Sequence, residues 1–187
     1  MSIYEDNSVI YHLYLDKLRN LNADNHMQMG RARRFRLPSP SSQSTTRNAQ
    51  DAIVEFTSPQ LQSIELPVIA PAVYHKPYRY AYGINNRDPK VHHTFADGII
   101  KLDMSSSPTE AKVWSEPNRT PSEPIFVPSP DGKEEDDGIL LSVVLDAQAM
   151  RSSMVIIDAK EMKEIGRAEM AGVFPIGFHG VWNGQKA

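Results

Sequence analysis

Cysteine is absent from this sequence of 187 residues. Its absence excludes a disulfide framework and every thiolate metal site, so a metal could be held only by histidine nitrogen or carboxylate oxygen. It also fits a reducing, cytoplasmic setting. Residues 1–21 carry charges throughout and do not resemble a signal peptide. No stretch approaches the roughly 20 apolar residues that span a bilayer, although contact with a membrane surface would need none.

An excess of charge of one sign is lacking as well. Lys and Arg number 20 against 23 Asp and Glu, which gives a formal net charge of -3. Such a balance provides no basic footprint for nucleic acid. The sequence also has no glycine-rich phosphate loop and no Gly-x-Ser-x-Gly nucleophile elbow, so nucleotide-binding and hydrolase functions lose their usual support.

The first 51 residues differ from the rest of the chain. Apolar residues at irregular gaps in Ile10–Leu21 permit a short amphipathic helix. Residues 22–51 are rich in Asn, Arg, Ser, Gln and Thr, and we predict a long polar connection there. Four arginines within it could bind an anion, but the apolar residues among them favour an exposed edge strand. These arginines are Arg31, Arg33, Arg34 and Arg36.

From residue 52 the chain changes to short β-rich runs separated by Pro, Gly, Asn and Asp, as in antiparallel all-β folds. A weak repeat of about 50 residues relates the runs that end at Asp103 and Asp158, and this period is typical of β-propeller blades. The predicted strands are Ala52–Phe56, Tyr78–Ile84, Gly98–Met104, Ala111–Glu116, Pro124–Pro128, Ile139–Asp146, Met154–Asp158 and Ile165–Met170.

The number of strands is too small for a closed ring. Propellers usually have about 4 to 8 four-stranded blades, and this chain offers material for two or three. We therefore predict an all-β partial propeller, in which 1–51 form a helical segment and a polar connection and 52–187 form the C-terminal blades. The run Ile139–Leu145 is apolar on both strand faces, which predicts a strand covered from both sides.

Histidines are the remaining candidates for metal ligands. His92 and His93 are adjacent, and adjacent residues of an extended chain point to opposite sides, so we expect a surface loop rather than a ligand pair. His179 lies between Phe178 and Gly180, in an apolar stretch where the chain changes direction. Taken alone, a histidine in such a place is ordinarily structural.

The acidic run Glu134–Asp137 precedes Gly138 and invites comparison with a calcium site. Calcium loops space their carboxylates alternately and place other oxygen ligands between them, whereas this run is continuous. We therefore predict a charged hairpin with an Asp-Gly turn.

Five motifs follow one another along the chain: Glu65-Leu66-Pro67, Tyr78-Arg79-Tyr80-Ala81-Tyr82-Gly83, Ser122-Glu123-Pro124-Ile125-Phe126-Val127-Pro128, Glu135-Asp136-Asp137-Gly138 with Leu141-Ser142-Val143-Val144, and Gly177-Phe178-His179-Gly180. Their order and spacing resemble the C-terminal portion of the carotenoid cleavage oxygenases. The resemblance runs from near Tyr4 to Trp182 and corresponds to about the last third of a family member.

The resemblance implies a seven-bladed β-propeller in which four histidines from different blades hold a non-haem Fe(II) on the axis. By this resemblance His179 is the last of the four ligands, and neutral imidazole suits Fe(II). Glu65 and Glu123 match two of the glutamates that accept the spare N–H of a ligand ring. We expect both to support histidines outside this chain. Without the resemblance, each would be taken for an exposed charge at a strand end.

The implied reaction is the O₂-dependent cleavage of a conjugated C=C bond in a carotenoid or apocarotenoid, which gives two carbonyl fragments. The resemblance implies no nucleic-acid partner, and it leaves room for peripheral membrane contact by the full-length protein. One imidazole cannot hold Fe(II) at useful affinity, so we expect the isolated chain to be inactive. The alternative is a truncated, non-catalytic propeller fragment that acts as an interaction module through its unpaired strand edges.

Overall fold

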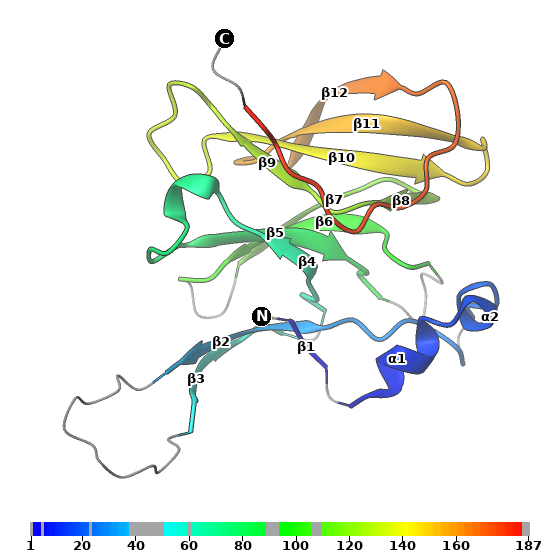
Figure 1. Cartoon of the computed structure of the whole chain (residues 1–187), viewed down its shortest axis with the longest axis horizontal. Helices are drawn as coiled ribbons and strands as arrows, with labels where there is room; N and C mark the ends of the chain where they lie inside the picture. Colours follow the sequence, from blue (N-terminus) through cyan, green and yellow to red (C-terminus); the bar gives the residue numbers. More distant parts are fainter. Residues whose placement is uncertain are drawn as a thin grey trace.

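The computed structural model describes residues 2–4, 6–22, 24–37, 51–59, 61–88, 94–105 and 110–184. Figure 1 shows three antiparallel sheets stacked as layers. The N-terminal part contains β1 (Ser2–Ile3), α1 (Ser8–His12), α2 (Leu15–Leu18), β2 (Arg31–Arg36) and β3 (Ile53–Thr57). The first sheet has the strand order β1-β2-β3. No helix among the described residues is long and apolar enough to cross a bilayer.

The second and third sheets are formed by the rest of the chain. The second is a meander in the order β4-β5-β6-β7, and in the third both β8 and β9 pair with β10, followed by β11 and β12. Their bounds are β4 (Glu65–Val68), β5 (Tyr80–Asn85), β6 (Gly98–Asp103), β7 (Ala111–Ser115), β8 (Arg119–Pro121), β9 (Ile125–Pro128), β10 (Gly138–Asp146), β11 (Arg151–Asp158) and β12 (Lys163–Glu169). A 3-10 turn, Pro71–Val73, joins β4 to β5.

Aspartates open the turns that produced the weak repeat in the sequence. Asp158 ends β11, and its Oδ1 accepts N–H bonds from Lys160 and Glu161. Asp103, the other aspartate of the repeat, ends β6, and its Oδ1 accepts the Ser105 N–H at 2.9 Å. Asp146, which ends β10 but is not part of the repeat, accepts N–H bonds from Gln148 and Ala149 in the same way. A short carboxylate that bonds the backbone two or three residues ahead favours a tight turn. These bonds return the chain antiparallel to itself at each strand end.

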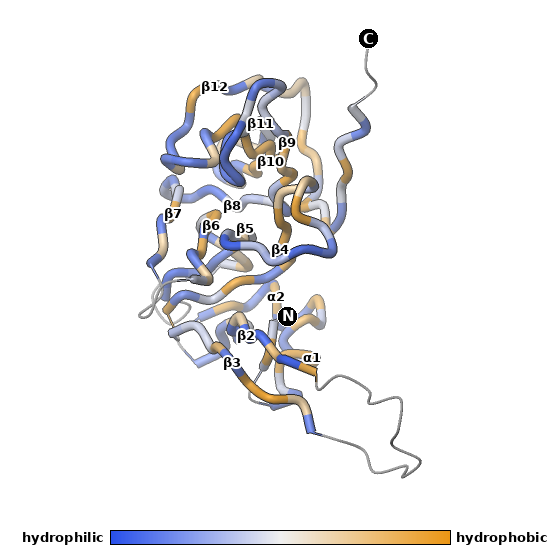
Figure 2. Tube along the Cα trace, turned by 90° about the vertical axis from the view of Figure 1, so that its left-hand side faces the viewer, coloured by the Kyte–Doolittle hydropathy of each residue, from blue (hydrophilic) through white to orange (hydrophobic). Residues whose placement is uncertain are grey.

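Two apolar cores lie between the three layers. Ile100, Leu102 and Ala81 of the second sheet pack toward Ala32 of the first. Tyr82, Ile99 and Trp114 pack on the other side of the second sheet, toward the third. The third sheet contributes Phe126, Leu140, Val144, Val155 and Ile157 to that core. Figure 2 shows hydrophobic stretches of the strands gathered inside this stack.

The strand predictions for residues 52–170 agree with β3, β5, β6, β7, β9, β10, β11 and β12 to within a few residues. Two short strands, β4 and β8, were not predicted. The prediction of one helix in Ile10–Leu21 is only partly confirmed. Tyr14 is extended (φ -67°, ψ 138°) and divides the helical segment into α1 and α2. His92 and His93, which we expected in a surface loop, lie outside the described residues.

The arginine-rich run is a strand, as predicted, but it does not lie at a sheet edge. β2 pairs with β1 on one side and with β3 on the other, within a range that we expected to be a polar connection. Its arginines bind protein groups: the Nε of Arg31 donates to Ser58 O at 2.9 Å, and the Nε of Arg36 to Glu55 at 2.9 Å. The sheet pairing therefore crosses the proposed boundary at residue 51, which stays a prediction.

Burial alternates along β10, so its two faces have different coverings. Leu140 and Val144 are 0% and 1% exposed and belong to the core shared with the second sheet. Leu141 and Val143, which point to the opposite face, are only half-buried. They line a pocket together with Phe174, Pro175 and His179 of the C-terminal segment. Coverage from both sides is thus provided by a sheet on one face and by an irregular segment on the other.

Candidate metal-ligand site

His179 lies in the C-terminal segment, residues 171–184, which has no helix or strand. Figure 1 shows this segment, in red, running from the end of β12 past β8 and β9. The imidazole Nδ1 lies 3.4 Å from Oε1 of Glu123, and the N–H of Gly180 donates to Oε2 of the same carboxylate at 2.8 Å. The His179 side chain is 82% exposed, whereas that of Glu123 is 10% exposed. A largely buried carboxylate therefore contacts an exposed imidazole.

Glu123 has a partner that the sequence did not suggest, because its carboxylate contacts His179 itself. Its expected support of a histidine outside the chain stays a prediction. Glu123 is close to His179 in space although the two are 56 residues apart in sequence. A carboxylate beside Nδ1 favours the tautomer that carries its proton on Nδ1, which leaves Nε2 as the nitrogen with a free lone pair.

Glu123 has a fixed position because the residue before it is part of the third sheet's hydrogen bonding. The N–H of Ser122 donates to Val143 O at 2.9 Å, and the Ser142 hydroxyl donates to Ser122 O at 2.9 Å. Pro124 follows, which restricts Glu123 to extended conformations. The carboxylate is thereby directed from the short connection between β8 and β9.

A pocket of about 300 Å³ lies beside the imidazole on the outer face of the third sheet. Most of its lining is apolar, with His179 and Glu123 as its titratable groups. Phe178 faces a different pocket of about 510 Å³, where Ile176 and Phe178 lie near Leu13, Leu18 and Leu21 of the N-terminal segment. The aromatic ring of Phe178 also meets Phe95 edge-on, with ring centroids 6.1 Å apart.

Glu65 is placed elsewhere, at the edge of the second sheet in β4. Its carboxylate accepts the Gly30 N–H at 2.9 Å and a hydrogen bond from the Tyr4 hydroxyl. Burial raises the pKa of Glu65, although both hydrogen bonds act in the opposite direction. Neither partner is a histidine, so support of a ligand outside this chain stays a prediction for Glu65.

The remaining described histidines do not join His179. Among the residues that the structure describes, no group of three or more His, Asp or Glu side chains could hold a metal ion. His75 is exposed in the connection before β5, with φ 62°. One imidazole with its carboxylate fits a single ligand position of a histidine-bound metal, and it does not make a complete site.

The acidic run has a structural role that the sequence did not reveal. It forms part of the β9–β10 connection, but Gly138 begins β10, so the predicted Asp-Gly turn is wrong. Glu135 accepts the N–H groups of Arg79 (2.9 Å) and Tyr80 (2.7 Å), and Asp136 accepts from Lys101 Nζ at 2.6 Å. These contacts join the third sheet to the second.

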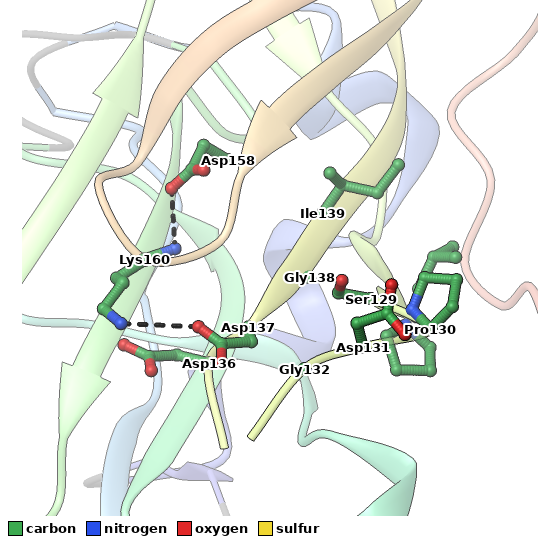
Figure 3. Close-up of a pocket in the computed structure, with 12 residues that line it drawn as sticks. Ser129, Pro130, Asp131, Gly132, Asp136, Asp137, Gly138, Ile139, Asp158 and Lys160 are labelled. Atoms are coloured by element: carbon green, nitrogen blue, oxygen red, sulfur yellow. Dashed lines mark hydrogen bonds and ion pairs between the residues drawn. The ribbon is translucent and has the colours of Figure 1, made fainter. Parts of the chain in front are cut away.

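Figure 3 shows the neighbouring Asp137 beside Lys160, whose Nζ lies 3.3 Å from Oδ1. Hydrogen bonds from the N–H groups of Glu134 and Lys133 lower the pKa of Asp137 to about 2. Figure 3 also shows Asp158 bonded to the Lys160 N–H, at 3.0 Å. Asp137, like Glu135 and Asp136, therefore has protein partners.

Comparison with known proteins identifies the family. The family described as "Retinal pigment epithelial membrane protein" (RPE65) matches residues 1–184. The chain is similar to the torulene dioxygenase of Fusarium fujikuroi, with 39% identity over 150 residues, which cover 79% of this chain and 25% of that relative. It is also similar to the carotenoid dioxygenase of Neurospora crassa, with 41% identity over 126 residues, which cover 67% of this chain and 20% of that relative.

Solved structures lead to the same family. A mutant of Synechocystis ACO matches this chain with a TM-score of 0.68 and 28% identity, and the matched region covers 89% of this chain and 33% of the ACO chain. Cobalt-substituted Synechocystis ACO matches with a TM-score of 0.61 and 26% identity, and the matched region covers 84% of this chain and 36% of the ACO chain. The chain belongs to the RPE65 and carotenoid oxygenase family. It spans about a quarter of the length of the curated relatives that it matches.

Proposed function

We propose that this chain is the C-terminal part of a non-haem Fe(II) carotenoid cleavage dioxygenase, and that its stacked sheets are two to three blades of a seven-bladed propeller. The contact between Glu123 and His179 carries the proposal, because it is the arrangement in which a carboxylate orients a ligand imidazole. Support also comes from the torulene and carotenoid dioxygenases among the relatives and from the cobalt-substituted ACO.

In this proposal His179 supplies Nε2 as one metal ligand. Glu123 accepts a hydrogen bond from Nδ1–H, which fixes the tautomer and makes Nε2 a stronger electron-pair donor to the metal. The Gly180 N–H, bound to the same carboxylate, prevents Glu123 from turning away. This histidine and three more from blades outside this chain would hold Fe(II). The chemistry that the metal would supply is O₂ activation for the cleavage of a conjugated C=C bond of a carotenoid or apocarotenoid into two carbonyl products.

A chimera tests the proposal. This chain would replace the matching quarter of the Fusarium torulene dioxygenase, and cleavage of torulene would be followed by chromatography of the products. We expect activity with the native chain and its loss, by at least about 100-fold, with His179→Asn. The control is His75→Asn, since His75 is exposed and its positive φ suits asparagine. Equal activities of the two variants would refute the role of His179.

A non-catalytic interaction module remains the second candidate. Among the residues that the structure describes, it is favoured by the single imidazole at the site and by β3, β7 and β12, each of which pairs with another strand on one side only. The purified 187-residue chain should hold no stoichiometric iron after EDTA treatment, and it should associate with itself or with complementary blades in sedimentation experiments. One EDTA-resistant iron per chain would overturn the proposal that the isolated chain is incomplete. A compact monomer would argue against open blade edges.

A further inference from the structure

The segment that carries His179, residues 171–184, forms no strand of its own, so contacts other than a regular strand pairing must fix its path. Two buried serine hydroxyls of the third sheet bind its backbone. Ser152, in β11, is 0% exposed, and Ser122, between β8 and β9, is 5% exposed. Buried hydroxyls need hydrogen-bond partners, because a buried hydroxyl without a partner destabilises the fold by its full desolvation free energy.

Ser152 anchors the start of the segment. Its Oγ accepts the Phe174 N–H at 3.0 Å and donates to the Phe174 carbonyl at 3.2 Å. Its main chain also binds the same stretch, since the Ser152 N–H donates to Gly172 O at 3.2 Å and the Met170 N–H donates to Ser152 O at 3.0 Å. One residue of β11 thus makes four hydrogen bonds to residues 170–174.

Ser122 anchors the middle of the segment. Its Oγ accepts the Gly177 N–H at 3.0 Å. The serine cannot shift easily, because its N–H and its carbonyl are bound to Val143 and Ser142 of β10. The next residue, Glu123, accepts the Gly180 N–H at 2.8 Å. Backbone anchors therefore occur at every third residue, Phe174, Gly177 and Gly180, and His179 lies between the last two.

We propose that Ser122 and Ser152 are positioning residues for the His179 imidazole. They hold the backbone so that Nδ1 faces Glu123 and Nε2 remains available. A glutamate alone would fix the ring only if the chain that bears the ring were already in place. The consequence for metal binding rests on the proposed function, whereas the positioning of the ring does not.

Alanine variants of the full 187-residue chain separate this role from general stability. Ser152→Ala and Ser122→Ala each remove a hydroxyl, and Ser153→Ala is the matched control. Ser153 is the adjacent buried residue of β11, 6% exposed, and its hydroxyl donates to Glu169 instead of the C-terminal segment. Amide hydrogen exchange, read by mass spectrometry on peptides within 171–180 and within β10, reports both the segment and the sheet, even if the chain associates.

Losing one anchor should raise the exchange rate within 171–180 about tenfold, the effect of one net hydrogen bond, with little change in β10. Nitrogen NMR of histidine-labelled chain, with His179 assigned through His179→Asn, should show the ring moving from the Nδ1–H tautomer toward Nε2–H in both serine variants. Ser153→Ala should change neither readout. Ser122→Thr, which restores the hydroxyl, should return the tautomer.

An unchanged tautomer and unchanged exchange in both serine variants would overturn the proposal. If one variant disrupts the sheet, rapid exchange in β10 will reveal it, and the other variant then decides. The outcome is independent of iron. A chimera without dioxygenase activity would count against the proposed function and leave the serine anchors standing, whereas an active chimera with an unresponsive tautomer would count only against the anchors.

Discussion

Replacing Lys101 by methionine should weaken the junction between the second and third sheets more than the loss of any exposed ion pair. The Lys101 side chain is 6% exposed, and its Nζ lies 2.6 Å from Oδ2 of Asp136, which is 7% exposed. Nζ also donates to Lys160 O at 3.2 Å and lies 4.1 Å from the centre of the Tyr80 ring. A single cation thus connects β6 of the second sheet with two turns of the third.

The expected loss follows from what Lys101→Met leaves behind. Removing one partner of a buried ion pair typically costs about 3–5 kcal/mol, because the other charge remains buried. The lost cation–π contact adds about 0.5–2 kcal/mol, and the methionine side chain keeps the packing of the lysine stem. We therefore expect a destabilisation of about 3.5–7 kcal/mol, a large share of a total stability of about 5–15 kcal/mol.

Lys112→Met is the matched control. Lys112 lies directly opposite Lys101 on the neighbouring strand β7. Its ion pair with Glu161, at 3.2 Å, joins side chains that are 50% and 56% exposed. Lys112 Nζ also donates to Lys160 O at 3.0 Å, in an exposed position where water can replace it. Exposed pairs contribute about 0–1 kcal/mol, so this variant should lose about 1 kcal/mol or less.

Urea unfolding followed by tryptophan fluorescence measures the difference. The chain has two tryptophans, of which Trp114 is 7% exposed in the core between the sheets and Trp182 is 52% exposed. In a Trp182→Phe background the signal therefore reports the junction. Adding Asp136→Asn to Lys101→Met should recover part of the stability, because no unpaired charge remains. Losses for Lys101→Met and Lys112→Met that agree within about 0.5 kcal/mol would refute the reasoning.

Three further predictions concern titration and the site. Burial raises the pKa of the Glu65 carboxyl in the folded protein. Its contribution to stability should therefore be fully present below its ordinary pKa of 4.5 and be lost as the pH rises through the higher folded pKa. Glu65→Gln should flatten that part of a Tm-against-pH profile. Burial alone would raise the pKa of Asp103, but hydrogen bonds from Arg79 and Ser105 lower it to about 2, so its contribution should be lost as the pH falls from 3.8 to 2, and Asp103→Asn should remove that dependence. In the chimera, Glu123→Gln should lower iron affinity about 10 to 100-fold, as measured by chelator competition, and unchanged affinity would contradict its role.

Local patterns in the sequence predicted most of the strands. Alternating and β-branched runs with polar turns identified β5, β6, β10 and β11, because both cores require apolar residues at those places. The strands β4 and β8 were missed for a local reason: each has only three or four residues and contains a proline, Pro67 or Pro121, which ordinarily argues against a strand.

Long-range contacts could not be predicted in the same way. The central position of β2 depends on β1 and β3, and the sequence between β2 and β3 has no periodic signal over residues 38–50. The contact between Glu123 and His179 joins residues 56 apart, and neither periodicity nor composition relates them. The resemblance suggested both residues as site groups, but the structure was needed to bring them together.

The motifs that carry the resemblance prove to be partners of one another. Glu135 of the acidic motif binds the backbone at Tyr80, at the start of the tyrosine motif. Ser122 and Glu123, adjacent in the Ser-Glu-Pro motif, bind Gly177 and Gly180 at the two ends of the histidine motif. One set of contacts therefore joins two sheets, and the other attaches the segment that carries His179 to the third sheet. Because the segment has no sheet pairing of its own, the place of His179 depends on both sets, and damage to the junction should reach the imidazole through the third sheet.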